Sequence, residues 1–215
     1  ICEKMQETAS KEKIRFEMVK ERHTQTLQTA LKQKKVDPQA IGLGLFLEKT
    51  KNYFTSSTCS GRIVLLKVNK QETKQDSAFI AKWHATTTIE KIWKALSEKT
   101  PGEIWFKQEP FILHIGCMDF ENAKKLLAIA KECGIKRAGI NSAKEGKFIL
   151  ELIGTHNIAF PVKKGATILF EKKQSVSMLI DYLHSTYHKE LEEGWGALEI
   201  GSLAKAEQHF QHVLQ

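Results

Sequence analysis

Six strand-forming runs lie between residues 61 and 171 of the sequence. These runs are rich in β-branched and other apolar residues, and they lie at 61–68, 79–84, 103–107, 111–117, 147–154 and 166–171. Two helices are expected among them, one that begins after Thr88 and ends before Pro101, and one over 120–133. Because several strands follow one another without a helix between them, the order predicts mixed or antiparallel sheets with packed helices, an α+β fold.

The helix over 120–133 has the clearest signal, because its apolar residues recur at helical spacing between a capping Asp119 and Gly134. The order strand, strand, helix occurs twice in the sequence, at 61–99 and at 103–133, and the helix over 120–133 ends the second copy. The repeated order suggests an internal duplication.

The two ends of the chain are expected to be helical. Residues 3–35 are dense in Glu, Lys, Gln and Thr with widely spaced apolar positions, which predicts an exposed helical arm. Asp37 and Pro38 are typical of a helix start, with Asp37 as the cap. Further helices are predicted from Ser175 and from about Ser202. The expected organisation is an arm over 1–36, an α+β core domain over 37–172, and C-terminal helices over 173–215 packed on that core.

An excess of basic residues limits the class of partner. The chain has 33 Lys and Arg against 25 Asp and Glu, a formal charge of +8. Such a charge favours polyanions such as nucleic acid, although a protein can also be basic without such a partner. No apolar run approaches the roughly 18 residues of a membrane helix, which predicts a soluble protein. Four separated cysteines without a CxxC pair predict a reducing, cytoplasmic setting and no structural zinc.

The most informative stretch is a hydroxyl-rich segment. Five hydroxyl or thiol side chains precede Ser60, Gly61 and Arg62, namely Thr55, Ser56, Ser57, Thr58 and Cys59. A loop of this kind can offer backbone N–H groups, hydroxyls and a guanidinium to an anion, and Gly61 lets a ligand approach the backbone closely. The same residues also suit an ordinary polar turn that leads into a strand. Cys59 has no neighbouring base in the sequence, so we interpret it as structural rather than nucleophilic.

Three histidines, His84, His114 and His156, lie in or beside strand-like runs. Each alone is typical of a core or edge position, whereas convergence of the three would form a polar cleft in which one of them accepts a proton. The pairs His184/His188 and His209/His212 have no third ligand in the pattern, so no metal site is expected. A complete glycine fingerprint, a Walker sequence, GxSxG and HExxH are all absent, which argues against a Rossmann-type nucleotide fold and against the enzyme classes that these motifs mark.

Five segments, taken in order, resemble the tRNA wybutosine-synthesising protein 3 family. They are NYFTSSTCSGRI (52–63), WH (83–84), EPFILHIGC (109–117), AKKLLAIAKECGIKRAGI (123–140) and THNIAFPV (155–162). The resemblance runs from about Phe16 to Leu191. It implies an S-adenosylmethionine-dependent methyltransferase that methylates N-4 of the wybutosine precursor base next to the anticodon of phenylalanine tRNA. It therefore implies S-adenosylmethionine as cofactor and the tRNA anticodon arm as partner. The implied fold is a duplicated α+β architecture rather than a Rossmann-type methyltransferase.

The resemblance also implies site residues at the matching positions. Those expected to bind the cofactor or the modified base are Thr55, Ser56, Ser57, Cys59, Ser60, Gly61, Arg62, Trp83 and His156. His84 and His114 are the catalytic candidates, since one of them could take a proton from the target nitrogen. Arg62 and Lys51 would hold a carboxylate or a phosphate. Trp83 or Tyr53 would stack on the base, as is common for single-stranded RNA.

Departures from the family pattern leave a second hypothesis open. Ala138 stands where a Ser is usual, Ile153 or Gly154 where an Arg is common, and Tyr187 near a usual Asn. A non-catalytic, tRNA-binding descendant of the family would show losses of this kind. A third hypothesis is an enzyme that acts on a small molecule and whose basic surface is incidental.

Overall fold

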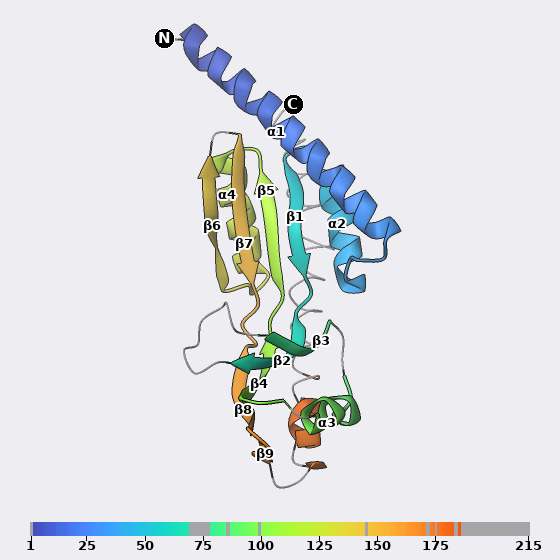
Figure 1. Cartoon of the computed structure of the whole chain (residues 1–215). Helices are drawn as coiled ribbons and strands as arrows, with labels where there is room; N and C mark the ends of the chain where they lie inside the picture. The colour runs from blue at the N-terminus through green and yellow to red at the C-terminus, as the bar shows by residue number, and fades with distance from the viewer. Residues whose placement is uncertain are drawn as a thin grey trace. The chain divides into compact units, whose positions relative to one another are not determined.

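The computed structural model describes residues 2–68, 78–84, 87–98, 100–144, 146–170, 173–174, 176–182 and 185. They form two compact units, and each contains its own antiparallel sheet (Figure 1). Of the described residues, the first unit holds those up to Ser60 and 112–155, and the second holds 61–111 and those after Thr155. The described helices include none with the length and apolar character needed to cross a lipid bilayer.

The first unit is built on a four-stranded sheet in the order β1-β5-β7-β6. Its strands are β1 (Tyr53–Cys59), β5 (Ile112–Cys117), β7 (Lys147–Ile153) and β6 (Arg137–Lys144), and all neighbours are antiparallel. Helix α4 (Phe120–Glu132) packs on one face, where the Phe120 and Phe148 rings are in contact. As predicted, Asp119 caps α4, because its Oδ1 accepts a hydrogen bond from the Asn122 N–H at 2.7 Å.

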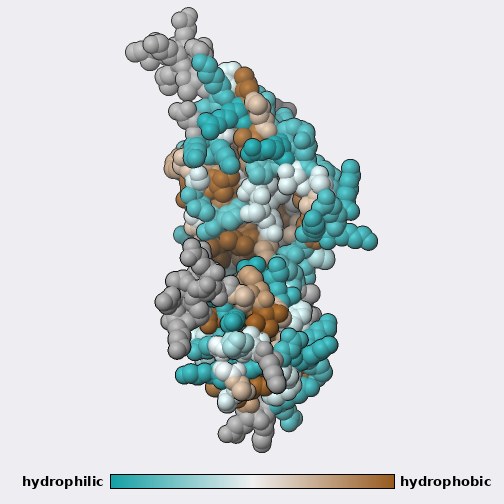
Figure 2. Space-filling model, in the orientation of Figure 1, coloured by the Kyte–Doolittle hydropathy of each residue, from teal (hydrophilic) through white to brown (hydrophobic). Residues whose placement is uncertain are grey.

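The opposite face of this sheet is covered in part by α1 (Cys2–Lys32) (Figure 1). The Phe54 ring of β1 lies on this face, and the rings of Phe16 and His23 from α1 pack on it with centroid distances of 5.6 and 4.8 Å. Phe16 is buried, whereas the outer side of α1 is largely hydrophilic (Figure 2). The prediction of an exposed helix docked along one stripe is therefore confirmed.

Helix α2 (Ile41–Lys49) packs beside β1 and follows a short 3-10 turn, η1 (Pro38–Ala40). The prediction that Asp37 caps this turn is wrong, because its carboxylate makes no hydrogen bond to it. Asp37 instead accepts hydrogen bonds from the Ser60 N–H at 2.9 Å and the Ser60 hydroxyl at 3.1 Å. Ser60 is fully buried, and buried polar groups need such partners.

The second unit is built on a five-stranded sheet in the order β3-β2-β4-β8-β9. Its strands are β3 (Ala78–Trp83), β2 (Arg62–Val68), β4 (Glu103–Glu109), β8 (Ile158–Lys164) and β9 (Thr167–Ile168). Helix α3 (Ile89–Ser97) and the helical residues 176–182 share an apolar core with this sheet. Lys163 is buried, and its Nζ donates to the carbonyls of Leu96 and Glu98 at the end of α3, each at 2.6 Å.

The predicted α+β class is confirmed, and the paired strands are antiparallel in both sheets. The prediction of a loop at 55–59 is wrong, because the backbone pairs with β5 from Tyr53 to Cys59. Strands β6 and β8 were also not predicted. Strands β2 and β3 pair with each other whereas β4 and β5 belong to different sheets, so the repeated order alone does not show a duplication, which stays a prediction.

The three-part organisation into arm, core and C-terminal helices also stays a prediction. The helix expected from Ser202 lies outside the described residues, as do His184, His188, His209 and His212.

Candidate functional site

Strand β1 brings its hydroxyl side chains to a pocket within the first unit. The pocket has a volume of about 230 Å³ and is bounded by α1, α2, the connection between them and β1. Its lining residues are His23, Thr26, Leu27, Ala30, Lys35, Val36, Ala40, Gly44, Thr55, Ser56, Ser57 and Thr58. The walls therefore combine hydroxyl groups from the strand with apolar side chains from the helices, and Lys35 adds a positive charge.

A β-bulge explains how four consecutive residues of β1 can line one pocket. In a regular strand, successive side chains point to opposite faces of the sheet. The pairing of β1 with β5 shifts in register between Thr55 and Ser57, which breaks this alternation at Ser56. The Thr55 and Thr58 hydroxyls lie 2.8 Å apart as a result, and the Ser56 hydroxyl donates to the His114 carbonyl at 3.4 Å.

His23 lines the pocket and carries an unsatisfied polar atom. Its Nε2 is buried and has no hydrogen-bond partner among the residues that the structure describes. Burial lowers the pKa of His23 below its ordinary value, and the positive charges of Lys147 and Arg22 lower it further. A neutral imidazole with an unpartnered nitrogen can accept or donate one hydrogen bond to a bound ligand.

A chain of polar side chains starts at Ser57 and runs across the four strands β1, β5, β7 and β6. The Ser57 Oγ lies 2.6 Å from His114 Nδ1, and His114 Nε2 lies 2.6 Å from Glu151 Oε2. Asn141 Nδ2 donates to the same Glu151 oxygen at 3.3 Å. His114 and Glu151 are opposite each other in the β5–β7 register, on the face that does not carry α4. Ser57 thus belongs both to the pocket wall and to this chain.

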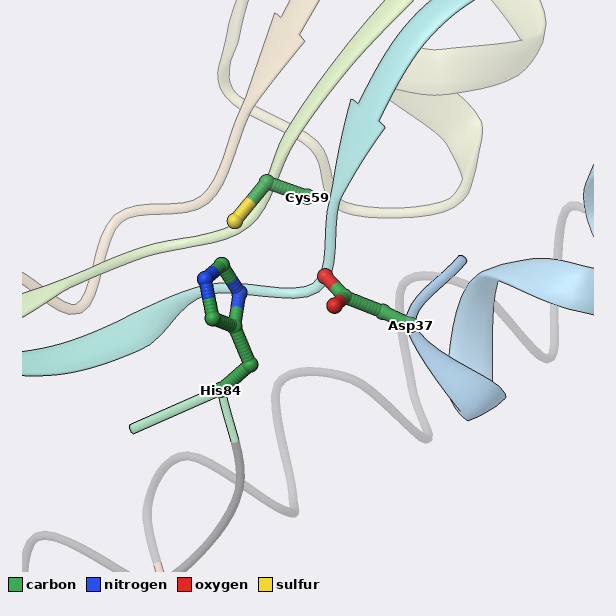
Figure 3. Close-up of side chains that lie close together, drawn as sticks. All are labelled: Asp37, Cys59 and His84. Carbon is green, nitrogen blue, oxygen red and sulfur yellow. The ribbon is translucent and has the colours of Figure 1, made fainter. Parts of the chain in front are cut away.

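The end of β1 is fixed by Asp37, whose hydrogen bonds to Ser60 are described above. Figure 3 shows Asp37 on the segment before α2 and Cys59 at the end of β1, both in the first unit, together with His84 of the second unit. Gly61 follows with a φ of 99°, a backbone conformation that glycine adopts without strain. The requirement for glycine here is therefore conformational.

The remaining predicted residues lie in the second unit. The Arg62 Nε forms an ion pair with Glu109, and its guanidinium lies over the Phe79 ring, 5.4 Å from the centroid. Trp83 packs against the apolar core from the edge strand β3. His84 follows β3 and is half-buried, whereas His156 is exposed between β7 and β8.

One face of the second sheet combines aromatic and basic side chains with two glutamates, Glu103, which accepts from the Trp105 Nε1, and Glu109, which pairs with Arg62. On it the register places Val64 between Lys82 and Lys107, and Leu66 between Phe79 and Trp105. The ammonium of Lys82 lies 5.9 Å from the centroid of the Phe79 ring, which is 53% exposed. We call Arg62, Phe79, Lys82, Trp105 and Lys107 the aromatic–basic face. Such surfaces suit single-stranded nucleic acid, in which bases stack on rings and phosphates meet cations.

The family model described as Methyltransferase TYW3 matches residues 10–197 of this chain. The chain belongs to this family. The resemblance inferred from the five ordered segments is thereby confirmed, and so is the enzyme class that it implied. The matched span contains both sheets, the pocket, the polar chain that starts at Ser57 and the aromatic–basic face.

Relatives within the TYW3 family cover most of the chain. The tRNA(Phe) 7-((3-amino-3-carboxypropyl)-4-demethylwyosine(37)-N(4))-methyltransferase of Methanocaldococcus jannaschii is 31% identical over 167 residues, which are 77% of this chain and 86% of the relative. An enzyme of the same name, numbered 1, from Thermococcus kodakarensis is 33% identical over 147 residues, 68% of this chain and 74% of the relative. The solved structure of the PH1069 protein from Pyrococcus horikoshii superposes with a TM-score of 0.80 at 27% identity, covering 87% of this chain and 95% of that one.

For this TYW3 chain, the structure brings Thr55, Ser56, Ser57 and His114 together in one unit. Sequence reasoning missed His23 and Glu151, which adjoin them. His23 lies on a helix with no local motif, and Glu151 is 37 residues from His114. Tyr53 is buried with its hydroxyl on the Asn122 carbonyl, so the expectation that its ring stacks on a base is wrong.

Proposed function

We propose that this protein transfers a methyl group from S-adenosylmethionine to N4 of 7-(3-amino-3-carboxypropyl)-4-demethylwyosine at position 37 of tRNA(Phe), in the cytoplasm. This is the activity that the names of its relatives state for them. The observation that carries the proposal is the extent of the family match, which spans residues 10–197 and so includes the pocket residues and the His114 chain. A match confined to one short motif would not include the pocket residues and the His114 chain together.

The pocket in the first unit fits the cofactor in its chemistry. S-adenosylmethionine carries a transferable methyl group on a sulfonium, with an adenine ring, ribose hydroxyls and an amino-acid carboxylate. The unpartnered Nε2 of His23 supplies one hydrogen-bonding atom for such a ligand. The Thr55 and Thr58 hydroxyls suit ribose oxygens, Leu27 and Val36 offer apolar surface for the adenine, and Lys35 would pair with the carboxylate.

The aromatic–basic face supports the anticodon arm as the part of the tRNA that is bound. Bases in an anticodon loop can leave their stack and be received by aromatic rings. Phe79 offers such a ring, and Lys82 lies beside it where a phosphate would be attracted, whereas the charge of Arg62 is already paired with Glu109. The formal charge of +8 gives the same expectation for the chain as a whole.

Calorimetric titration with S-adenosylmethionine tests the cofactor part of the proposal. We expect one binding site, with affinity lowered about tenfold by Lys35→Ala through loss of the carboxylate partner, an effect of about 1.4 kcal/mol. The matched control is Lys136→Ala, which removes an exposed lysine outside the pocket. Binding of tRNA without any detectable binding of the cofactor would favour the non-catalytic descendant instead.

Measuring tRNA affinity against salt concentration separates the small-molecule hypothesis from the other two. Each phosphate that the protein neutralises should add roughly −0.7 to −0.9 to the slope of log K against log salt. We expect a slope that corresponds to several phosphates. A flat plot would argue for an enzyme whose basic surface is incidental.

A further inference from the structure

The donor and the acceptor of each hydrogen bond in the chain that starts at Ser57 can be assigned, so the chain has one direction of donation. An ionised carboxylate only accepts hydrogen bonds, so the contact between Glu151 Oε2 and His114 Nε2 requires the proton to be on Nε2. In the neutral imidazole, Nδ1 is then the acceptor, and the Ser57 hydroxyl donates to it at 2.6 Å. Asn141 donates to the same Glu151 oxygen, which helps to hold the carboxylate in place.

This direction leaves the lone pairs of Ser57 Oγ available at the pocket. Ser57 is exposed and lines the pocket, whereas His114 and Glu151 are half-buried behind it on β5 and β7. A hydroxyl that donates to a histidine, which in turn donates to a carboxylate, is a more basic oxygen than an isolated hydroxyl. The β-bulge between Thr55 and Ser57 places this oxygen within reach of both the pocket and His114.

We propose that Ser57 is the catalytic residue that accepts the proton of the target nitrogen, and that Glu151 is a positioning residue that fixes His114 in the tautomer this requires. The inference rests on the proposed function. As the nitrogen–methyl bond forms and the carbon–sulfur bond breaks, the electron pair of the broken bond stays on sulfur. Ser57 Oγ accepts the N–H proton, and the Ser57 hydroxyl proton passes to His114 Nδ1. Glu151 stabilises the resulting imidazolium.

The test combines turnover with a spectroscopic measurement on the protein without ligands. We expect Glu151→Gln to lower kcat on the order of 10²-fold, the range for loss of an effective proton acceptor, with KM for tRNA little changed. Ser57→Ala should lower kcat by a similar factor, and its exposed position leaves the fold intact. The matched control is Glu132→Gln, the same change at an exposed glutamate of α4 on the other side of the sheet.

Nitrogen-15 NMR of the His114 ring reports the tautomer directly. We expect the proton on Nε2 in the wild-type protein and a mixture of tautomers in Glu151→Gln. A proton on Nδ1 in the wild type would overturn the inference, as would wild-type turnover in Glu151→Gln or in Ser57→Ala. Methyl transfer by the wild type together with unaffected variants would overturn this inference alone, whereas absence of transfer by the wild type would overturn the proposed function and this inference with it.

Discussion

The ring of Phe54 lies directly over Gly116 of the neighbouring strand. The two residues are opposite each other in the β1–β5 register, and a Cβ added to Gly116 would lie 2.0 Å from the Phe54 ring. The same ring is the surface on which Phe16 and His23 of α1 pack. A glycine on β5 thus makes room for the aromatic cluster that docks α1, and His23 of this cluster lines the pocket.

We expect Gly116→Ala to lower the free energy of unfolding by about 1–3 kcal/mol, because the new methyl group forces the buried Phe54 ring to move. Gly139→Ala is the matched control, since a Cβ there meets no atom within 4 Å. Urea unfolding of both variants measures the difference. Equal stability of the two variants would show that the Phe54 ring is not held against Gly116.

Stability should depend on pH through His23. Its pKa is lowered in the fold, first by burial and then by Lys147 and Arg22, whereas the unfolded chain keeps the ordinary value of 6.5. Below about pH 6.5 the unfolded state therefore binds more protons, and the free energy of unfolding falls as the pH is lowered. We expect a smaller fall in His23→Gln, whose other histidines are unchanged. Urea unfolding of both proteins at pH 7.5 and pH 5.5 measures this fall in the free energy of unfolding. An equal fall in the wild type and in His23→Gln would contradict the burial of this imidazole.

Cys117 should resist alkylation in the folded protein. Burial raises the pKa of its thiol to about 12, with a smaller contribution from Asp119, so almost no thiolate is present at pH 8. Cys133 is half-buried and serves as the internal control. Mass spectrometry after iodoacetamide treatment should show Cys133 modified at least about ten times faster than Cys117 in the folded protein. In urea, where the protein is unfolded, the two cysteines should be modified at similar rates. Modification of Cys117 at the rate of Cys133 before unfolding would contradict the packing of β5.

Phe79 should contribute to tRNA affinity. Loss of base stacking on an aromatic side chain costs about 1–3 kcal/mol, which corresponds to about 5- to 150-fold in the dissociation constant of Phe79→Ala. Phe120→Ala is the matched control, because Phe120 is 51% exposed and lies on α4 of the first unit. Filter-binding or calorimetric titration with tRNA gives both constants. A greater loss in the control than in Phe79→Ala would place the tRNA elsewhere.

The sequence predicts those elements whose signal is local. Helix α4 was predicted because its cap, its apolar spacing and its terminal glycine all lie within about 15 residues. Strand β1 was not, because four polar residues in succession lack the alternation that marks a strand, and its pairing partner β5 lies more than 50 residues away. Strand β8 was not predicted because it contains Pro161, which a strand tolerates where its N–H is not needed. The strand predicted at 166–171 is shorter in the structure, where β9 covers Thr167–Ile168 and pairs with Lys163 and Lys164.

The candidate site follows the same rule. Thr55, Ser56 and Ser57 were singled out because their composition is unusual within one short segment. His114 was singled out as well, but its partner Glu151 was not, since only the β5–β7 register brings them together. Arg62 was expected to hold an anion, and its ion pair with Glu109 follows from the β2–β4 register instead.

Methyl transfer to tRNA(Phe) tests the central claim most directly. The tRNA is isolated from cells that lack this protein, so that the target base is unmethylated at N4, and it is incubated with the protein and S-adenosylmethionine labelled in the methyl group. We predict label at the base at position 37 next to the anticodon, strongly reduced in Glu151→Gln and retained in Glu132→Gln. Binding of this tRNA without incorporation of label would contradict the account.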